Sequence, residues 1–248
     1  VITGGALRLS AAGQILDDIQ ARLGFAGRSI TVESGSATLG GGSVRFGGQM
    51  LLLDEGGSEL NLHADLHSTT VRPIPELHAT LTGNLNLIGP LDDLQLLGRI
   101  KLESLRYTAN LDLEHLIPKR NAPPLHVPAL DPQRAIKLAI NLQAPKNVIL
   151  SNNVVEAEFQ VDLMVTGTSQ HVGLIGSVTP LWGKARYRDN LFTVERGSID
   201  FSEEFRIFTQ FDIHATTEAC DMKIAVDVHG NSDHYNVVPK GQDENCLL

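Results

Sequence analysis

The sequence predicts an all-β protein, an elongated antiparallel-type sheet built from repeated hairpin-like units. Three observations predict this fold: apolar and polar residues alternate along most of the chain, glycine-rich turns separate the alternating runs, and one strand–turn–strand unit recurs at a constant offset. Alternation with period two is the pattern of a strand with one shielded and one solvated face. A hydrophobic content of 42% is ordinary for a chain that buries part of its surface.

Alternation is clearest in three runs near the middle of the chain. Their apolar members are Leu60, Leu62, Ala64 and Leu66, then Ile136, Leu138, Ile140 and Leu142, then Ala157, Phe159, Val161, Leu163 and Val165. Polar residues such as Asn61, His63 and Asp65 occupy most of the positions between them. Similar runs follow at 205–215 and 224–228. Each run therefore predicts a strand of an antiparallel-type sheet with one apolar face.

Turn residues separate these runs. Gly40–Gly42, Gly89-Pro90 and Arg196–Ser198 are combinations typical of turns. The apolar phase also slips by one residue at Gly197, because the apolar positions pass from Phe192 and Val194 to Ile199 and Phe201. The slip predicts a β-bulge or a turn at that point.

A proline-rich stretch divides the chain. Residues 109–134 contain five prolines, and we expect an irregular excursion there, with one helical turn around 111–117. This stretch is the predicted boundary or hinge between a first part of the sheet, residues 1–108, and a second part, residues 135–248.

One hairpin-sized unit recurs along the chain. The pattern from Leu85 through Gly89 to Ile100 matches the pattern from Leu163 through Gly167 to Val178, at an offset of 78 residues, and Val226–Gly230 repeats its first half. A unit that cannot bury its own apolar face must stack on its neighbours, which favours an elongated sheet. The alternative is that this pattern is simply common in β-hairpins.

Charge and hydropathy exclude several classes of partner. The formal net charge is −9 with scattered basic residues, which disfavours nucleic acid and anionic membrane surfaces as direct partners. No run approaches the roughly 20 apolar residues of a membrane span. Because the chain begins in mid-pattern at Val1, we expect it to be a segment of a longer protein, with any anchor outside it.

The sequence predicts neither an enzyme nor a cofactor site. It contains no Gly-x-Ser-x-Gly motif, and the glycines at 40–42 lead into another strand rather than the helix of a phosphate-binding loop. No metal site is predicted, because His63 and His67 on a strand lie roughly 13 Å apart. His229, Asp233 and His234 are interpreted as an ordinary polar turn.

Two cysteines, Cys220 and Cys246, lack the spacing of zinc ligands. A disulfide between them is possible in an oxidising compartment, and the alternative is two independent thiols.

Several segments resemble the TamB family of the AsmA-like group. They are 81–91 (LTGNLNLIGPL), 97–102 (LGRIKL), Asn152-Asn153 with the following strand, and above all 183–201 (GKARYRDNLFTVERGSIDF). The last segment, in the part 135–248, is similar to the family's C-terminal signature. The resemblance covers most of the chain and is most specific from Ala79 to Gly230.

The resemblance implies a folded-over sheet, a β-taco or half-pipe with an apolar interior. It also implies a periplasmic segment of a Gram-negative protein that is anchored in the inner membrane by an N-terminal helix outside this chain. Family members reach an outer-membrane barrel partner of the Omp85 type (TamA-like), move phospholipid to the outer membrane and support autotransporter assembly.

A lipid groove is therefore expected along the apolar edges of the strands. Its candidate lining residues are Leu85, Leu87, Leu138, Ile140, Val161, Leu163, Val165, Ile199 and Phe201. The alternative is that they close on one another as the dry core of a β-sandwich or solenoid, which would make the chain a scaffold or docking module. A β-helical polysaccharide-cleaving enzyme would need clustered outward acids and bases, and a membrane barrel would need aromatic girdles that 5% aromatic content does not supply.

Overall fold

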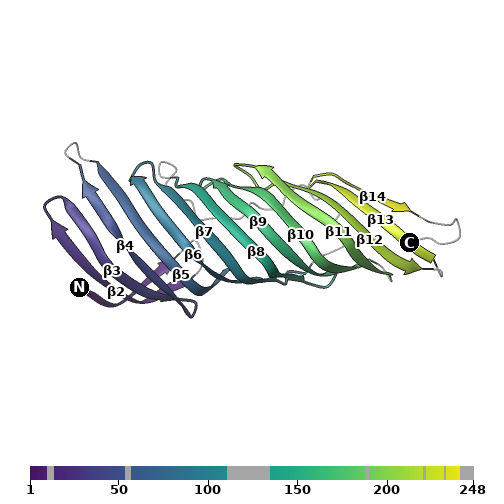
Figure 1. Ribbon diagram of the computed structural model, residues 1–248, viewed down its shortest axis with the longest axis horizontal. Helices are drawn as coiled ribbons and strands as arrows, with labels where there is room; N and C mark the ends of the chain where they lie inside the picture. Colours follow the sequence, from purple (N-terminus) through teal and green to yellow (C-terminus); the bar gives the residue numbers. More distant parts are fainter. Residues whose placement is uncertain are drawn as a thin grey trace.

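The fold is a single long layer of strands (Figure 1). The computed structural model describes residues 1–9, 14–53, 57–110, 135–187, 190–219, 222–231 and 233–240, and in these residues it contains fourteen strands and no helix. The strands are β1 (Ile2–Leu9), β2 (Gln14–Ala26), β3 (Ser29–Leu39), β4 (Gly42–Leu52), β5 (Ser58–Ile74), β6 (Leu77–Pro90), β7 (Gln95–Tyr107), β8 (Lys137–Ser151), β9 (Val155–Gly167), β10 (Val172–Tyr187), β11 (Asn190–Glu203), β12 (Thr209–Ala219), β13 (Met222–Asn231) and β14 (Tyr235–Lys240).

The strands lie side by side in chain order, from β1 at one end of the sheet to β14 at the other. The two terminal strands do not pair with each other, so the sheet is open, and the all-β prediction is confirmed.

One neighbouring pair of described strands departs from the predicted antiparallel arrangement. β7 and β8 run parallel, with Gln95 opposite Lys137 and Tyr107 opposite Leu150. A parallel pair needs a long crossover connection, and the stretch from Tyr107 to Lys137 has the necessary length. Alternation carries no information about strand direction, which is why the sequence could not predict this pair. The sheet continues without a break across β7 and β8.

The predicted boundary falls between these two strands. Residues 111–134, including the helical turn expected at 111–117, lie outside the described residues. The division into 1–108, 109–134 and 135–248 stays a prediction.

Cross-strand register joins the alternating runs into one apolar face. Leu62 lies opposite Leu87, Leu87 opposite Leu96, and Leu96 opposite Leu138, so the apolar residues of four strands form a continuous row. The intervening polar residues face the other side and are mostly exposed. The alternation therefore predicts the two faces of the sheet correctly.

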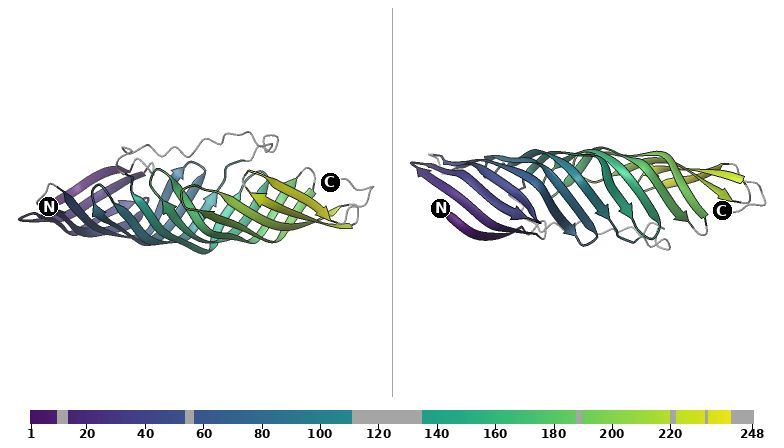
Figure 2. Two further views of the ribbon diagram at one scale, coloured as in Figure 1. Left: turned by 90° about the horizontal axis from the view of Figure 1, so that it is seen from above. Right: turned by 60° about the horizontal axis from the view of Figure 1, so that its bottom comes forward.

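A line of β-bulges crosses the sheet along its length. The extra residues lie at 67–68 in β5, at Glu103 in β7, at 145–147 in β8, at Leu181 in β10 and at Glu195 in β11. We call this line the crease. A bulge bends its strand and increases the local twist, so aligned bulges fold the sheet lengthwise. The views in Figure 2 show the resulting curl: parts of the sheet lie behind other parts, so that their ribbons overlap in projection.

Two predictions were made for the region around Gly197, a turn and a bulge, and the structure contradicts the first and confirms the second. β11 runs through residues 196–198 without a turn, so the turn predicted there is wrong. The predicted bulge is confirmed, two residues before Gly197. The turn at Gly40-Gly41 is also present, and Gly89-Pro90 ends β6 as expected.

The hydrophobic core lies at the crease. Its buried members are Ala79, Leu102, Ala144, Val148, Val161 and Leu163. Leu105 and Phe159 pack on this cluster from one side of the crease, and Leu142, Leu174 and Phe201 pack on it from the other side. Both halves of the bent strands thus converge on the same cluster, which forms the floor of a half-pipe.

The predicted repeat is visible as two equivalent hairpins, β6–β7 and β9–β10. A Cβ atom on Gly98 would lie 2.3 Å from the carbonyl oxygen of Asn84, and one on Gly176 would lie 2.3 Å from that of Asp162. Each residue of the first pair lies 78 positions before its counterpart. Only glycine permits so close an approach of neighbouring backbones. The repeat therefore preserves a position at which two neighbouring strands of the curled sheet are in close contact.

Candidate functional site

The apolar inner face of the curled sheet is the candidate functional site, and we call it the apolar trough. By register, all nine predicted lining residues lie on it. Val161 and Leu163 are buried at the floor. The other seven are half-buried: Leu85, Leu87, Leu138, Ile140, Val165, Ile199 and Phe201.

A second wall of the trough was missed by reasoning from sequence. It lies on the other side of the crease and includes Ala157, Ala185, Phe192, Val194, Ala215 and Val226. Ala157, Ala215 and Val226 continue the alternating runs of their own strands. In β10 and β11 the bulges shift the apolar phase by one residue, so in these two strands strict alternation does not connect this wall to the first. The one-residue slip of the apolar phase at Gly197 was the sequence signal that could have revealed this wall. The apolar phase slips in the same way in β10, between Val178 and Gly183.

The walls of the trough have no second layer over them. Leu85, Leu87 and Ile140 lie within long strands on the apolar face, yet they remain half-buried. Among the described residues, the largest side chains with less than 2% exposure are those of Ile224 and Thr69. In a β-sandwich an opposing sheet would cover such leucines and isoleucines. The trough therefore exposes apolar surface along its walls while its floor is closed.

Carboxylates on the outer, polar face hold the crease in shape. Thr82 Oγ1 donates a hydrogen bond to Glu103 Oε1 at 2.6 Å, and Ser68 Oγ donates to Glu103 Oε2 at 3.1 Å. The hydrogen bond from Thr82 is the main reason that the pKa of Glu103 is below its usual value. Asn147 Nδ2 donates to the Glu103 carbonyl at 3.2 Å. Glu103 thus ties together the bulges of β5, β7 and β8.

Glu158 joins the next two bulges in the same way. The backbone N–H of Asn147 donates to Glu158 Oε1, and Trp182 Nε1 donates to Glu158 Oε2, both at 2.8 Å. These hydrogen bonds, the one from Asn147 first, lower the pKa of Glu158. The curl is consequently held from the outer face by hydrogen bonds within the sheet.

The sequence model of the TamB C-terminal domain matches residues 33–238, which span β4 to β13 completely and most of β3 and β14. The chain belongs to the TamB family. A comparison with curated proteins finds no match. The matched segment contains both walls of the trough and all nine predicted lining residues, so in this TamB chain the trough is a feature of the family domain itself.

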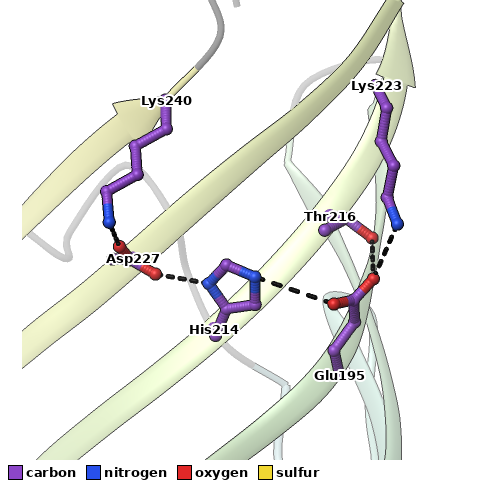
Figure 3. A network of polar contacts seen from close by, with 6 residues as sticks. All are labelled: Glu195, His214, Thr216, Lys223, Asp227 and Lys240. Atoms are coloured by element: carbon purple, nitrogen blue, oxygen red, sulfur yellow. Dashed lines mark hydrogen bonds and ion pairs between the residues drawn. The ribbon is translucent and has the colours of Figure 1, made fainter.

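A network of polar side chains ties together the last four strands of the TamB sheet (Figure 3). Glu195 accepts hydrogen bonds from Lys223 at 2.9 Å and from Thr216 at 3.0 Å. His214 lies between two carboxylates, with Nε2 3.7 Å from Glu195 and Nδ1 2.5 Å from Asp227. Lys240 Nζ lies 2.5 Å from Asp227 Oδ2 and so attaches the edge strand β14. The network supports the end of the sheet where every side chain of β14 is exposed.

We expect Asp227→Asn to destabilise the protein in a pH-dependent way. The hydrogen bond from His214, and then that from Lys240, lowers the pKa of Asp227 from 3.8 to about 2. A carboxylate with a lowered pKa in the folded state stabilises that state above pH 3.8, and this stabilisation is lost as the pH falls through about 2. Urea unfolding of the unsubstituted chain and of Asp227→Asn at several pH values measures the difference between their free energies of unfolding. It should be largest near pH 7 and shrink below pH 3.8, and a constant difference across this range would contradict the account.

The remaining sequence-derived candidates stay apart from the trough. His63 and His67 are exposed on the outer face of β5. His234 and Asp233 lie in the turn between β13 and β14, where the side chain of Asn231 accepts both of their backbone N–H groups. In the part of the chain that the structure describes, no three His, Cys, Asp or Glu side chains are grouped as a metal ion would require.

Cys220 and Cys246 both lie outside the described residues, so their pairing stays a prediction. None of the described segments is a helix long and apolar enough to cross a membrane.

Proposed function

We propose that the trough of this TamB chain binds the acyl chains of phospholipid and conducts lipid between the inner and the outer membrane. The observation that supports it is a continuous apolar face, curled into a trough, whose walls remain half-exposed. A lipid chain supplies the apolar contact that these walls lack.

The energetics of such a site suit a conduit. Transferring an acyl chain from water to an apolar surface stabilises it by about 0.8 kcal/mol per CH₂ group. Because neighbouring strands are about 4.8 Å apart and present similar residues, a chain that slides along the trough exchanges one set of contacts for an equivalent set. Binding is therefore firm while the barrier at each step is low. No nucleotide-binding loop is present among the described residues, so the driving force for direction comes from outside this segment.

Membership of the TamB family supports the place that we propose for this conduit. The family belongs to the envelope of Gram-negative bacteria and associates in general with an Omp85-type partner. We propose that the chain lies in the periplasm and that parts outside this segment anchor the protein in the inner membrane. An Omp85-type barrel, TamA-like, is its outer-membrane partner, and the assembly of autotransporters is a second outcome of the same activity. The role is transport and assembly rather than catalysis.

A scaffold with a dry core is the second candidate. The closed cluster at the crease, with Ala144 at 0% and Leu102 at 5% exposure, favours it, because these positions need no guest. The half-exposed walls favour lipid. The two candidates therefore differ only in what covers the walls.

Mass spectrometry of lipid that co-purifies with the chain tests the proposal. The chain is produced in the periplasm of a Gram-negative host, purified without detergent and measured under native conditions. We expect phospholipid bound to most of the protein, since half-exposed apolar walls are costly in water. Protein that carries no lipid above the level of an unrelated periplasmic protein would contradict the proposal and favour the dry scaffold.

A further inference from the structure

One long border of the sheet carries exposed apolar side chains at nearly every turn. This border contains the turns β2/β3, β4/β5, β6/β7, β9/β10, β11/β12 and β13/β14, and β4, β6 and β11 run toward it (Figure 1). The exposed large apolar residues at these turns are Phe25, Leu52, Leu53, Leu91, Phe205, Ile207 and Tyr235. Phe25 is 73% exposed and Phe205 60% exposed. We call this row the apolar border.

The opposite border differs. Its fully described turns, at Gly40-Gly41, 75–76 and 152–154, contain no exposed large apolar side chain. Ile15 and Leu191 are exposed nearby, but both lie on the outer face, because their chain neighbours Leu16 and Phe192 occupy the inner one. Leu7, in the edge strand β1, is the exception: it is exposed near this border and lies opposite Leu16 on the inner face. Exposed apolar residues that extend the trough are thus concentrated on the apolar border, which forms one long edge of the half-pipe.

Register connects the apolar border to the trough. Phe25 lies opposite Ile30, Ile30 opposite Met50, and Met50 opposite Leu60, so Phe25 extends a row of the inner face. At the other end of the sheet, the ring of Tyr235 lies 6.4 Å from that of Phe211, which belongs to the inner face of β12. The apolar surface of the trough therefore continues over this lip to the solvent.

The turn between β11 and β12 is held so that two apolar side chains point outward. Arg206 forms an ion pair with Glu203 at 3.2 Å, and its guanidinium lies 4.7 Å from the centre of the Phe208 ring. On either side of Arg206, Phe205 and Ile207 are exposed. Thr166 Oγ1 donates to the Glu204 carbonyl at 3.0 Å and fixes the turn on the end of β9. This turn covers the β9/β10 turn, which is the one place where the border lacks an apolar residue of its own.

We propose that the apolar border is the side on which single acyl chains pass laterally into the trough, an inference that rests on the proposed lipid-binding function. Successive turns on this border are two strand widths apart, about 10 Å, or three strand widths across the parallel pair of β7 and β8, so the apolar residues form a row of separate contacts rather than a patch for a protein partner. Acidic residues lie between them, which disfavours an anionic bilayer surface as the occupant: Asp92, Asp93, Glu203, Glu204 and Asp233. A single alkyl chain fits both features.

The test compares variants of the two borders. The double variant F205S/I207S removes apolar contacts on the proposed lip, and the control I15S/L191S removes residues of similar exposure near the opposite border. Phosphatidylcholine vesicles that contain an acyl-labelled fluorescent phosphatidylcholine donate lipid to each purified protein. We expect F205S/I207S to load about tenfold more slowly while reaching the plateau of the unsubstituted chain, and the control to load at the unsubstituted rate.

The other outcomes separate this inference from the proposed function. If both double variants load at the rate of the unsubstituted chain, or both slow equally, the border has no special role, although binding itself still supports the trough. If F205S/I207S lowers the plateau, its residues belong to the storage surface and the lateral route is wrong. If the unsubstituted chain takes up no label, the proposed function fails. Urea unfolding of all three proteins establishes that each is folded before transfer is measured.

Discussion

Replacing Gly176 by alanine is expected to destabilise the protein by about 3 kcal/mol or more and to open the curl of the sheet. Gly176 has φ of +123°, and a Cβ atom there would lie 2.3 Å from the carbonyl oxygen of Asp162. Alanine therefore incurs backbone strain of about 1–3 kcal/mol together with a similar cost for moving β9 away. Urea unfolding measures the change in the free energy of unfolding.

Gly41→Ala is the matched control. Gly41 also has a positive φ, +86°, but a Cβ atom there meets nothing within 4 Å. This substitution thus carries the backbone strain alone, about 1–2 kcal/mol. The difference between the two variants isolates the close approach of β9 and β10. Equal destabilisation would show that the glycine is needed for its dihedral angles and not for the curl.

The two faces of the sheet could be predicted from the sequence, but the crease could not. Within β8, alternation from Leu138 to Leu142 places these residues on the inner face correctly. The extra residues of a bulge become visible only when partner strands are aligned, because register depends on both strands. One local signal was nevertheless present: within long strands, where proline is otherwise excluded, Pro145 lies in a bulge and Pro180 lies beside one.

The candidate site was predicted only in part for the same reason. All nine lining residues share the inner face, yet most of them belong to one wall, since the phase shift in β10 and β11 hides Ala185 and Phe192 from a period-two pattern. The parallel pairing of β7 and β8 could not be predicted from the sequence either, because alternation does not depend on strand direction. The exposure of the wall residues depends on whether another layer covers them, so it could be known only from the structure.

Leu87→Asp is expected to lower the amount of bound phospholipid at least tenfold while the protein stays folded. Leu87 lies in the row with Leu62 and Leu96 on the inner face and is half-buried, so a carboxylate there keeps contact with water in the free protein. An acyl chain that covers this position must desolvate the charge, and a cost of only about 1.4 kcal/mol reduces affinity tenfold. Titration of the lipid-free protein with a fluorescent phospholipid measures the affinity.

Asn86→Asp adds the same charge one residue away in β6. Asn86 faces the outer side, opposite His63, and the substitution should leave lipid binding unchanged. Equal loss of affinity in both variants would mean that the added charge acts through the net charge of the protein and not through the trough.

Photo-crosslinking at Ile140 and Asn141 tests most directly whether the inner face holds lipid. These neighbours in β8 face opposite sides of the sheet, Ile140 within the trough and Asn141 exposed on the outer face. A photoreactive side chain is placed at each position in turn, and the protein is irradiated in the presence of labelled phospholipid. The account predicts strong labelling at position 140 and background labelling at position 141. Background labelling at position 140, or equal labelling at both positions, would contradict it.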